Sequence, residues 1–212
     1  MNREIETALV ESMVILINSR DRITGTHVLK SRQYVKILVE EMRNYTPLTE
    51  EKVQNIVYAA PLHDIGKIDI PDSVLKKKEK YDDKDYSCMK KHTIIGSQIL
   101  ESTINIFLDR FGYTPEILEE GKVLAEFHHE KWDGSGYPHG LKGEEIPLSA
   151  RIMAVADVFD AYTARRLDSE PLDFSKSVAY IENGAGNHFD PQIVKTFLEV
   201  KDKIYYELKN NK

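Results

Sequence analysis

The 212-residue chain has a single cysteine, no long apolar run and no excess of positive charge. Its one cysteine, Cys88, excludes a disulfide framework and is compatible with a reducing compartment. The longest apolar runs, such as residues 13–17, are far too short for the core of a signal peptide or for a membrane span. We therefore expect a cytoplasmic protein without membrane insertion.

The net charge of the chain is −6. An acidic chain is a poor partner for DNA or RNA polymers, so broad nucleic-acid binding is not expected. A small anionic substrate is still compatible with this charge, because bound cations can set the local field against the overall sign. Four lysines gather within residues 76–80, and we interpret them as a solvated turn rather than a binding patch.

Alternation typical of strands is also lacking, and apolar residues recur with helical spacing almost throughout the chain. This pattern predicts an all-α fold in one domain. Helices are expected around residues 5–16, 28–42, 49–60, 86–100, 115–130, 147–164, 174–183 and 191–208.

Several helix ends are marked in the sequence. Thr49 is the predicted N-cap of the third helix, and Pro61 is expected to kink that helix near Val57. Residues 114–115 and 190–191 are predicted starts in which a capping residue precedes a proline.

The one long segment without helical period is residues 131–146, KWDGSGYPHGLKGEEI. Its four glycines and its Asp-Gly and Tyr-Pro pairs predict a turn-rich loop, and an ordered loop of this length is usually functional. Tyr137 and Trp132 offer flat faces on which a base could stack. For Trp132 we favour a role as the anchor of the loop in the core.

The seven histidines are placed unevenly along the chain. The positions of most of these histidines and of two aspartates predict that five helices each bring an imidazole or a carboxylate to one point, as metal-binding helical bundles do. Plainer interpretations stay open for single residues, such as a pairing of Asp157 with Arg151. We expect His139 to be exposed and His188 to be structural. The candidate metal ligands are His27, His63, Asp64, His92, His128, His129 and Asp157.

Six sequence blocks, five of which contain these residues, resemble those of one family. HDIGKIDIP at residues 63–71 is similar to the HD-domain phosphohydrolase signature. HHEKWDGSGYPHGLKGEEIP at residues 128–147 resembles the extended HD-GYP signature at nearly every position. The other similar blocks, in the same order as in the family, are TGTH ending at His27, KKHTIIGSQIL around His92, RIMAVADVFDAYT from Arg151 and NHFDP at 187–191.

The resemblance implies a single HD-type helical bundle with a long GYP loop. It implies an HD-GYP catalytic domain over residues 1–212, with a core of about 18–200. Family members often carry an attached sensory domain, and none is expected here. All seven candidate ligands match the family's metal ligands, with Asp64 bridging two divalent transition-metal ions. The family implies iron or manganese, whereas the ligand types alone also admit zinc, cobalt or nickel.

The activity implied by the resemblance is hydrolysis of cyclic di-GMP to linear pGpG, and onward to GMP. Asp64 and Lys67 would be catalytic, and Lys67, Tyr137 and Arg166 would contact the substrate. A related cyclic dinucleotide as substrate stays open, as does a catalytically weak module that binds a cyclic dinucleotide or docks a partner. A regulatory protein partner or a homodimer is also expected.

Two departures from the family pattern change these expectations. Ile23 stands where members with a third metal ion carry a glutamate, so we predict two ions. Ser169 and Glu170 stand where basic residues that hold substrate phosphate are expected, although Arg166 matches and Arg165 lies beside it. The second phosphate contact is therefore either missing or supplied by another residue, such as Arg165.

Overall fold

The computed structural model describes residues 3–20, 24–163 and 173–210, with backbone alone at 24–29 and 207–210. The prediction of an all-α fold is confirmed, since no strand occurs in these ranges and only an isolated bridge joins Ala185 to Phe189. The α-helices are α1 (Arg3–Arg20), α2 (Thr24–Met42), α3 (Glu50–Ala59), α4 (Asp72–Leu75), α5 (Asp83–Lys90), α6 (His92–Phe111), α7 (Glu116–Phe127), α8 (Leu148–Thr163), α9 (Phe174–Asn183) and α10 (Pro191–Asn210), and the 3-10 helices are η1 (Ala60–Leu62), η2 (Ile65–Asp69) and η3 (Gly143–Glu145).

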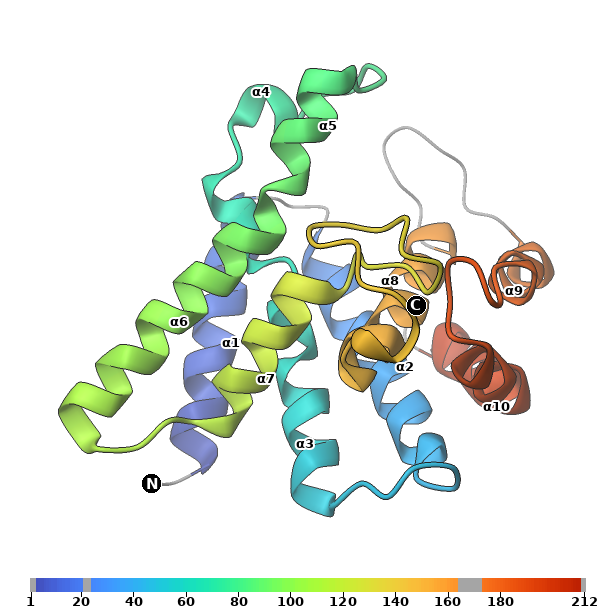
Figure 1. Cartoon of the computed structure of the whole chain (residues 1–212), viewed down its shortest axis with the longest axis horizontal. Coiled ribbons are helices and arrows are strands. Elements are labelled where there is room, and N and C mark those ends of the chain that lie inside the picture. Colours follow the sequence, from blue (N-terminus) through green and yellow to red (C-terminus); the bar gives the residue numbers. More distant parts are fainter. Residues whose placement is uncertain (1–2, 21–23, 164–172, 211–212) are drawn as a thin grey trace.

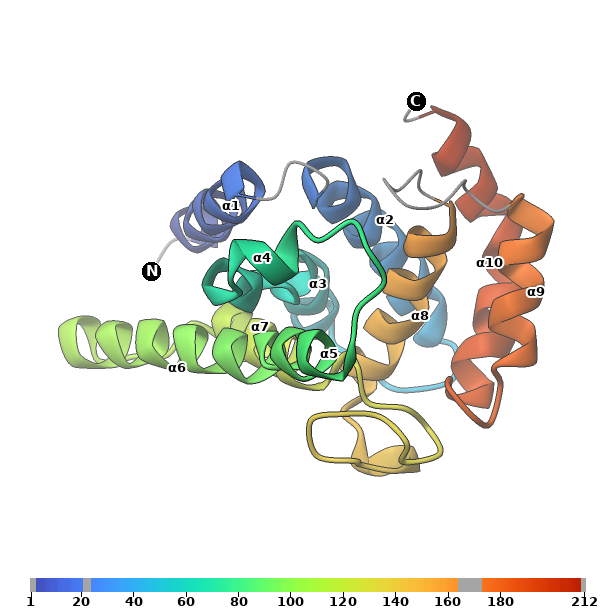
Figure 2. The ribbon, with the colours of Figure 1, turned by 90° about the horizontal axis from the view of Figure 1, so that it is seen from above.

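The helices pack around α2, which contacts α3, α8 and α10. Helices α6 and α7 form a pair at one end of the molecule, and α9 and α10 form another at the opposite end (Figures 1 and 2). The short helices α4 and α5 project from one side (Figure 1). Large side chains fill the interior, among them the fully buried Tyr34, Leu38, Ile56, Phe159 and Phe197.

Helix α3 begins where the sequence predicts and ends earlier. The Thr49 hydroxyl accepts a hydrogen bond from the backbone N–H of Lys52 at 3.1 Å, which confirms the predicted N-cap. The predicted kink near Val57 is wrong: α3 ends at Ala59, and the chain continues as the 3-10 turn η1, which contains Pro61. Proline lacks a backbone donor, so a tighter turn replaces the α-helix at this point.

The helix expected around residues 86–100 is in fact two helices, α5 and α6, separated at Lys91. Asp82 ends the preceding loop with a capping box, accepting from the backbone N–H of Lys84 and Asp85 at 2.8 Å each. The predicted cap at residue 114 is also wrong, because Pro115 itself is the N-cap residue of α7.

The start of α10 agrees with the prediction from residues 190–191. Asp190 accepts from the backbone N–H of Gln192 at 2.8 Å, and Pro191 opens the helix. The other oxygen of Asp190 accepts from Arg151 at 2.7 Å. Arg151 thus pairs with Asp190, and not with Asp157 as in the plainer interpretation of Asp157.

The backbone of η2 at Gly66 is in close contact with the backbone at the start of α6. A Cβ atom added at Gly66 would lie 1.9 Å from the carbonyl oxygen of His92 and 2.5 Å from the backbone nitrogen of Gly96. Glycine at this position therefore permits the contact that brings the segment after Asp64 against the helix that begins at His92.

Candidate metal centre

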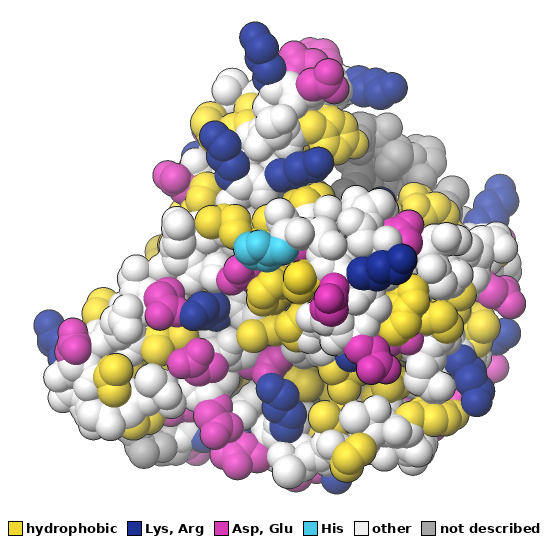
Figure 3. All heavy atoms as spheres, viewed as in Figure 1, with side chains coloured by type: hydrophobic (Ala, Val, Ile, Leu, Met, Phe, Trp, Pro, Cys, Tyr) yellow, Lys and Arg dark blue, Asp and Glu magenta, His cyan; other side chains and the backbone are white. Residues whose placement is uncertain are grey.

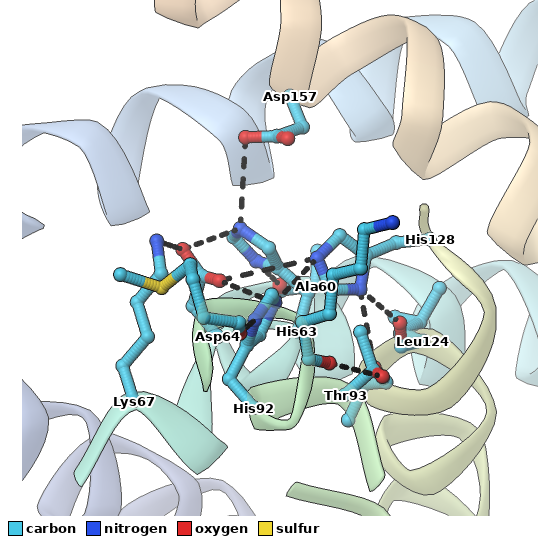
Figure 4. Close-up of polar contacts among 12 residues, drawn as sticks. Ala60, His63, Asp64, Lys67, His92, Thr93, Leu124, His128 and Asp157 are labelled. Atoms are coloured by element: carbon cyan, nitrogen blue, oxygen red, sulfur yellow. Dashed lines mark hydrogen bonds and ion pairs between the residues drawn. The ribbon is translucent and has the colours of Figure 1, made fainter. Parts of the chain in front are cut away.

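Six of the seven predicted ligands have described side chains, and the structure brings them together. We call them the histidine–aspartate cluster: His63, Asp64, His92, His128, His129 and Asp157. The first two lie between η1 and η2, the third opens α6, the next two follow α7, and the last belongs to α8. Figure 4 shows His63, Asp64, His92 and His128 pointing toward one another, with Asp157 reaching them from α8.

The carboxylate of Asp64 lies in the middle of the cluster. Its Oδ2 atom is 3.4 Å from Nε2 of His63, and its Oδ1 atom is 3.4 Å from Nε2 of His92 and 3.9 Å from Nε2 of His128. Asp157 Oδ1 is 3.8 Å from Nε2 of His63. The two oxygens of Asp64 therefore face different imidazoles, which is the arrangement that a bridging carboxylate needs.

Three imidazoles are held in a fixed orientation by backbone carbonyls of their own segments. Nδ1 of His63 lies 2.8 Å from the oxygen of Ala60, and Nδ1 of His92 lies 2.6 Å from that of Met89. Nδ1 of His128 lies 2.9 Å from the oxygen of Leu124. A carbonyl only accepts, so each Nδ1 carries the proton and each Nε2 turns its lone pair into the cluster.

His129 completes a group of three ring nitrogens. Ligand atoms of His92, His128 and His129 all lie within 4.8 Å of one another. Nε2 of His92 and Nε2 of His128 are 3.5 Å apart. Two lone pairs this close repel each other unless a cation or a proton lies between them, so the geometry fits a metal ion.

Burial and nearby charges keep the imidazoles of His92, His128 and His129 neutral and the central carboxylate charged. Burial is the main cause that lowers the pKa of His92, His128 and His129, that of His129 to about 3. Burial opposes the ionisation of Asp64, but Lys67 nevertheless helps to hold the pKa of this carboxyl well below its usual range. Neutral imidazole and ionised carboxylate are the forms that ligate metal ions.

Lys67 reaches the cluster from the 3-10 helix η2. Its ammonium nitrogen is 2.6 Å from Oδ2 of Asp64. The side chain is partly buried, so the ion pair lies at the edge of the cluster rather than in open solvent.

The loop of residues 131–146 packs against the cluster. The ring of Tyr137 stacks on the imidazole of His129, with centroids 4.8 Å apart and planes at 29°. Burial, with a contribution from Asp64 and Asp157, raises the pKa of the Tyr137 hydroxyl, which therefore stays protonated. The peptide bond before Pro138 is cis.

Trp132 is half-buried and tied into the fold by its backbone. Its N–H donates to the oxygen of His188 at 3.1 Å, and its carbonyl accepts from Gly143 at 2.9 Å. The guanidinium of Arg151 lies 5.7 Å from the ring centroid. These backbone contacts hold the loop at Trp132, but its half-buried ring is not part of the hydrophobic core of the described residues, so the expected anchoring in the core is not borne out.

Glu130 is a residue whose role the sequence did not indicate. Its side chain is 2% exposed, and its carboxylate accepts from the backbone N–H groups of His139, Gly140 and Leu141 at 2.7, 3.1 and 3.1 Å. An acid directly between the histidine pair and the glycine-rich loop was the one available signal. The carboxylate holds the returning half of the loop against the end of α7.

The two remaining histidines lie outside the cluster. His139 is exposed, as expected, and its Nε2 pairs with Glu126 at 2.8 Å. His188 stacks on Phe189 with centroids 4.2 Å apart, which agrees with a structural role. Burial is the main cause that lowers its pKa, to about 4.

Several predicted residues lie outside the described part of the chain. These are the side chain of His27 and the whole of Ile23, Arg165, Arg166, Ser169 and Glu170. The backbone of α2 does include residue 27. The predictions made for these residues stay predictions.

Residues 11–193 match the model of a family described as HD domain. The chain belongs to the HD domain family. This match and the similar curated proteins confirm the resemblance to HD-GYP proteins.

Two curated relatives of this HD-domain chain come from Vibrio cholerae serotype O1. One, named cyclic di-GMP phosphodiesterase, is 43% identical over 92% of this chain and 39% of its own length. The other, named 3'3'-cGAMP-specific phosphodiesterase 2, is 37% identical over 95% of this chain and 36% of its own length. The chain thus spans well under half of the length of either relative.

A solved structure shares the fold of this HD-domain chain. It is the HDG"Y"P protein Bd1817 of Bdellovibrio bacteriovorus, with a TM-score of 0.56 and 17% identity over 80% of this chain and 51% of the other. The likeness agrees with the helical HD-type bundle expected from the sequence.

The outer surface gives further context. No helix among the described residues is long and apolar enough to cross a membrane. On the described part of the face seen in Figure 3, acidic and basic side chains are interspersed, and no patch of one sign covers it. The lysines near residue 76 belong to the projecting α4–α5 region, where Lys76 and Lys77 pair with Asp72 and Asp85.

Proposed function

We propose that this chain is a metal-dependent phosphodiesterase that hydrolyses cyclic di-GMP to linear pGpG, and onward to GMP. The single observation that carries the proposal is the position of Asp64, whose two carboxylate oxygens face different imidazoles across a buried cluster. The names of the curated relatives supply the substrate class, a cyclic dinucleotide.

The donor set fits two divalent transition-metal ions. On one side of Asp64 lie His63 and Asp157, and on the other lie His92, His128 and His129. In this proposal, His27 of α2 is the remaining ligand. A mixed set of imidazole nitrogens and carboxylate oxygens suits iron or manganese, and also zinc, cobalt or nickel, better than magnesium or calcium.

When bound, such ions neutralise charge on a phosphodiester and lower the pKa of a water molecule toward neutrality. The chain's own residues then do the positioning. Lys67 already places its ammonium beside Asp64, where it can donate to a non-bridging phosphate oxygen. The protonated Tyr137 hydroxyl, which interacts electrostatically with Asp64 and Asp157, offers a further donor, and Arg166 is the proposed second contact with phosphate.

The test starts with anaerobic purification, loading with Fe²⁺ or Mn²⁺, and measurement of metal content per chain. The loaded protein is incubated in parallel with cyclic di-GMP and 3'3'-cGAMP, and products are separated by chromatography. We expect two ions per chain and pGpG as the first product. Asp64→Asn should lower the metal content and abolish hydrolysis, whereas Asp69→Asn, an exposed carboxylate in η2, should change neither.

The other outcomes separate the alternatives. Faster cleavage of 3'3'-cGAMP would make the related dinucleotide the substrate, in line with the second relative's name. Binding of either dinucleotide without cleavage by the metal-loaded protein would reject the enzyme and leave a binding module. A regulatory protein partner and a homodimer both stay predictions. Light scattering of the metal-loaded protein would test for the homodimer.

A further inference from the structure

His129 is held differently from the other described histidines of the cluster. The rings of His63, His92 and His128 each have Nδ1 bonded to a backbone carbonyl. Within the described residues, His129 has no hydrogen bond at either ring nitrogen, and its ring contacts are aromatic. Without a hydrogen bond, rotation about the bond to the ring decides which nitrogen faces the cluster.

Tyr137 provides the contact that restricts this rotation. Its ring lies nearly parallel to that of His129, at 29° and 4.8 Å, which is an offset stacking geometry typical of aromatic pairs. The ammonium of Lys90 lies 5.1 Å from the centre of the same tyrosine ring. The tyrosine is thus packed between a cluster histidine and a cation of α5.

The backbone before and at Tyr137 is fixed against the end of α7. The N–H of Tyr137 donates to the carbonyl of His129 itself at 3.2 Å. At Gly136, an added Cβ would lie 2.3 Å from the nitrogen of Lys131 and 2.6 Å from Cα of Glu130. Only a residue without a Cβ atom therefore fits at position 136, this close to the end of α7.

Glu130 secures the next part of the loop. Its buried carboxylate accepts from three consecutive backbone N–H groups, at residues 139–141. Both oxygens act as acceptors, so an amide in place of the carboxylate would set an NH₂ group against a backbone donor. The side chain next to His129 in sequence therefore holds the loop that carries the tyrosine stacked on His129.

We propose that Tyr137 is a positioning residue that orients the imidazole of His129 as a metal ligand by stacking, and that Glu130 is the anchor that keeps Tyr137 in place. The GYP loop then helps to build the metal centre. This inference rests on the proposed binding of metal ions by the histidine–aspartate cluster.

The experiment measures Co²⁺ binding to the metal-free full chain by titration calorimetry and by the visible absorption of the bound ion. Tyr137→Leu keeps bulk and removes the aromatic face, and Tyr137→Phe keeps the face and removes the hydroxyl. Glu130→Gln tests the anchor. Matched controls are Tyr206→Ala, an exposed ring on α10, and Glu144→Gln, an exposed acid in the same loop.

Tyr137→Leu and Glu130→Gln should weaken binding of one Co²⁺ ion by about 10- to 100-fold, the usual effect of losing a group that orients a ligand, and should change its spectrum. Tyr137→Phe should restore wild-type affinity and spectrum. Wild-type binding in Tyr137→Leu, or equal loss in Tyr137→Phe, would overturn the inference. Should Tyr137→Leu fail to fold by circular dichroism, Glu130→Gln and Tyr137→Phe decide by the same criteria.

The outcome is separable from that of the proposed function. A wild-type chain that binds no Co²⁺ would reject the metal site and with it the phosphodiesterase. A wild-type chain that binds two ions, with variants that bind them equally well, would reject the positioning role alone.

Discussion

The contact at Gly66 permits a quantitative prediction for the substitution Gly66→Ala. The added methyl group would lie 1.9 Å from the carbonyl oxygen of His92, and real Cβ contacts essentially never fall below 3.0 Å. The neighbouring atoms belong to the backbone of α6, so they cannot move aside by a change of rotamer. Segment η2 and the start of α6 must therefore separate by about 1.1 Å.

This displacement would act directly on the cluster. Asp64 lies just before η2, and His92 is the first residue of α6, with Oδ1 and Nε2 only 3.4 Å apart. A misplacement of about 1 Å costs a catalytic site about 100-fold in rate. Inserting a methyl group into a closely packed contact costs about 1–3 kcal/mol in the free energy of unfolding.

The assay compares the wild type, Gly66→Ala and the control Asp69→Ala, which changes an exposed side chain of the same segment. We expect Gly66→Ala to lose about 100-fold in kcat for the cyclic dinucleotide. Its Tm should fall by about 2–4 °C for each kcal/mol lost. Wild-type rate, metal content and Tm in Gly66→Ala would refute the reasoning, because the contact would then have room for a methyl group.

Three further predictions concern capping, pH and metal removal. Thr49→Ala should lower the free energy of unfolding by about 1 kcal/mol, because Lys52 loses its capping acceptor, and should leave hydrolysis unchanged; urea denaturation and the activity assay check both. The pKa of His188 is about 4 in the folded chain and about 6.5 when unfolded, so only the unfolded chain gains this proton between these values. The free energy of unfolding of the wild-type chain should therefore fall as the pH is lowered from about 6.5 to about 4. In His188→Gln, the slope of this free energy against pH should be smaller by up to about 1.4 kcal/mol per pH unit. Treatment with EDTA should abolish hydrolysis and lower the Tm, because ions that bind only the folded cluster stabilise it, and added Mn²⁺ should restore both.

Much of the fold is readable in the sequence because helices are local structures. The apolar spacing predicts α9 at residues 174–183 as the structure has it, and the cap at Thr49 follows from a hydroxyl placed before two acids. Where a helix ends is less local. The sequence alone does not distinguish a kink from the 3-10 turn at Pro61, since packing after Ala59 decides between them.

The candidate ligands were also predictable, from the joint pattern of imidazoles and carboxylates and from the resemblance to one family, whereas each residue alone admits a plainer interpretation. The sequence thus determined the all-α class, the ligand types and six of the residues that meet in the cluster. How they meet depends on atoms that carry no sequence signal. The carbonyls that orient His63, His92 and His128 belong to Ala60, Met89 and Leu124, whose side chains indicate nothing about this role.

Only the tertiary structure decided the relations between distant segments. It pairs Arg151 with Asp190 and brings Gly66 into contact with α6. It also places the ring of Tyr137 over that of His129, in the loop that Glu130 holds. Each of these contacts depends on distances across space between segments that packing brings together. Local patterns specify which groups are available for a metal centre, and packing decides which of their atoms face one another.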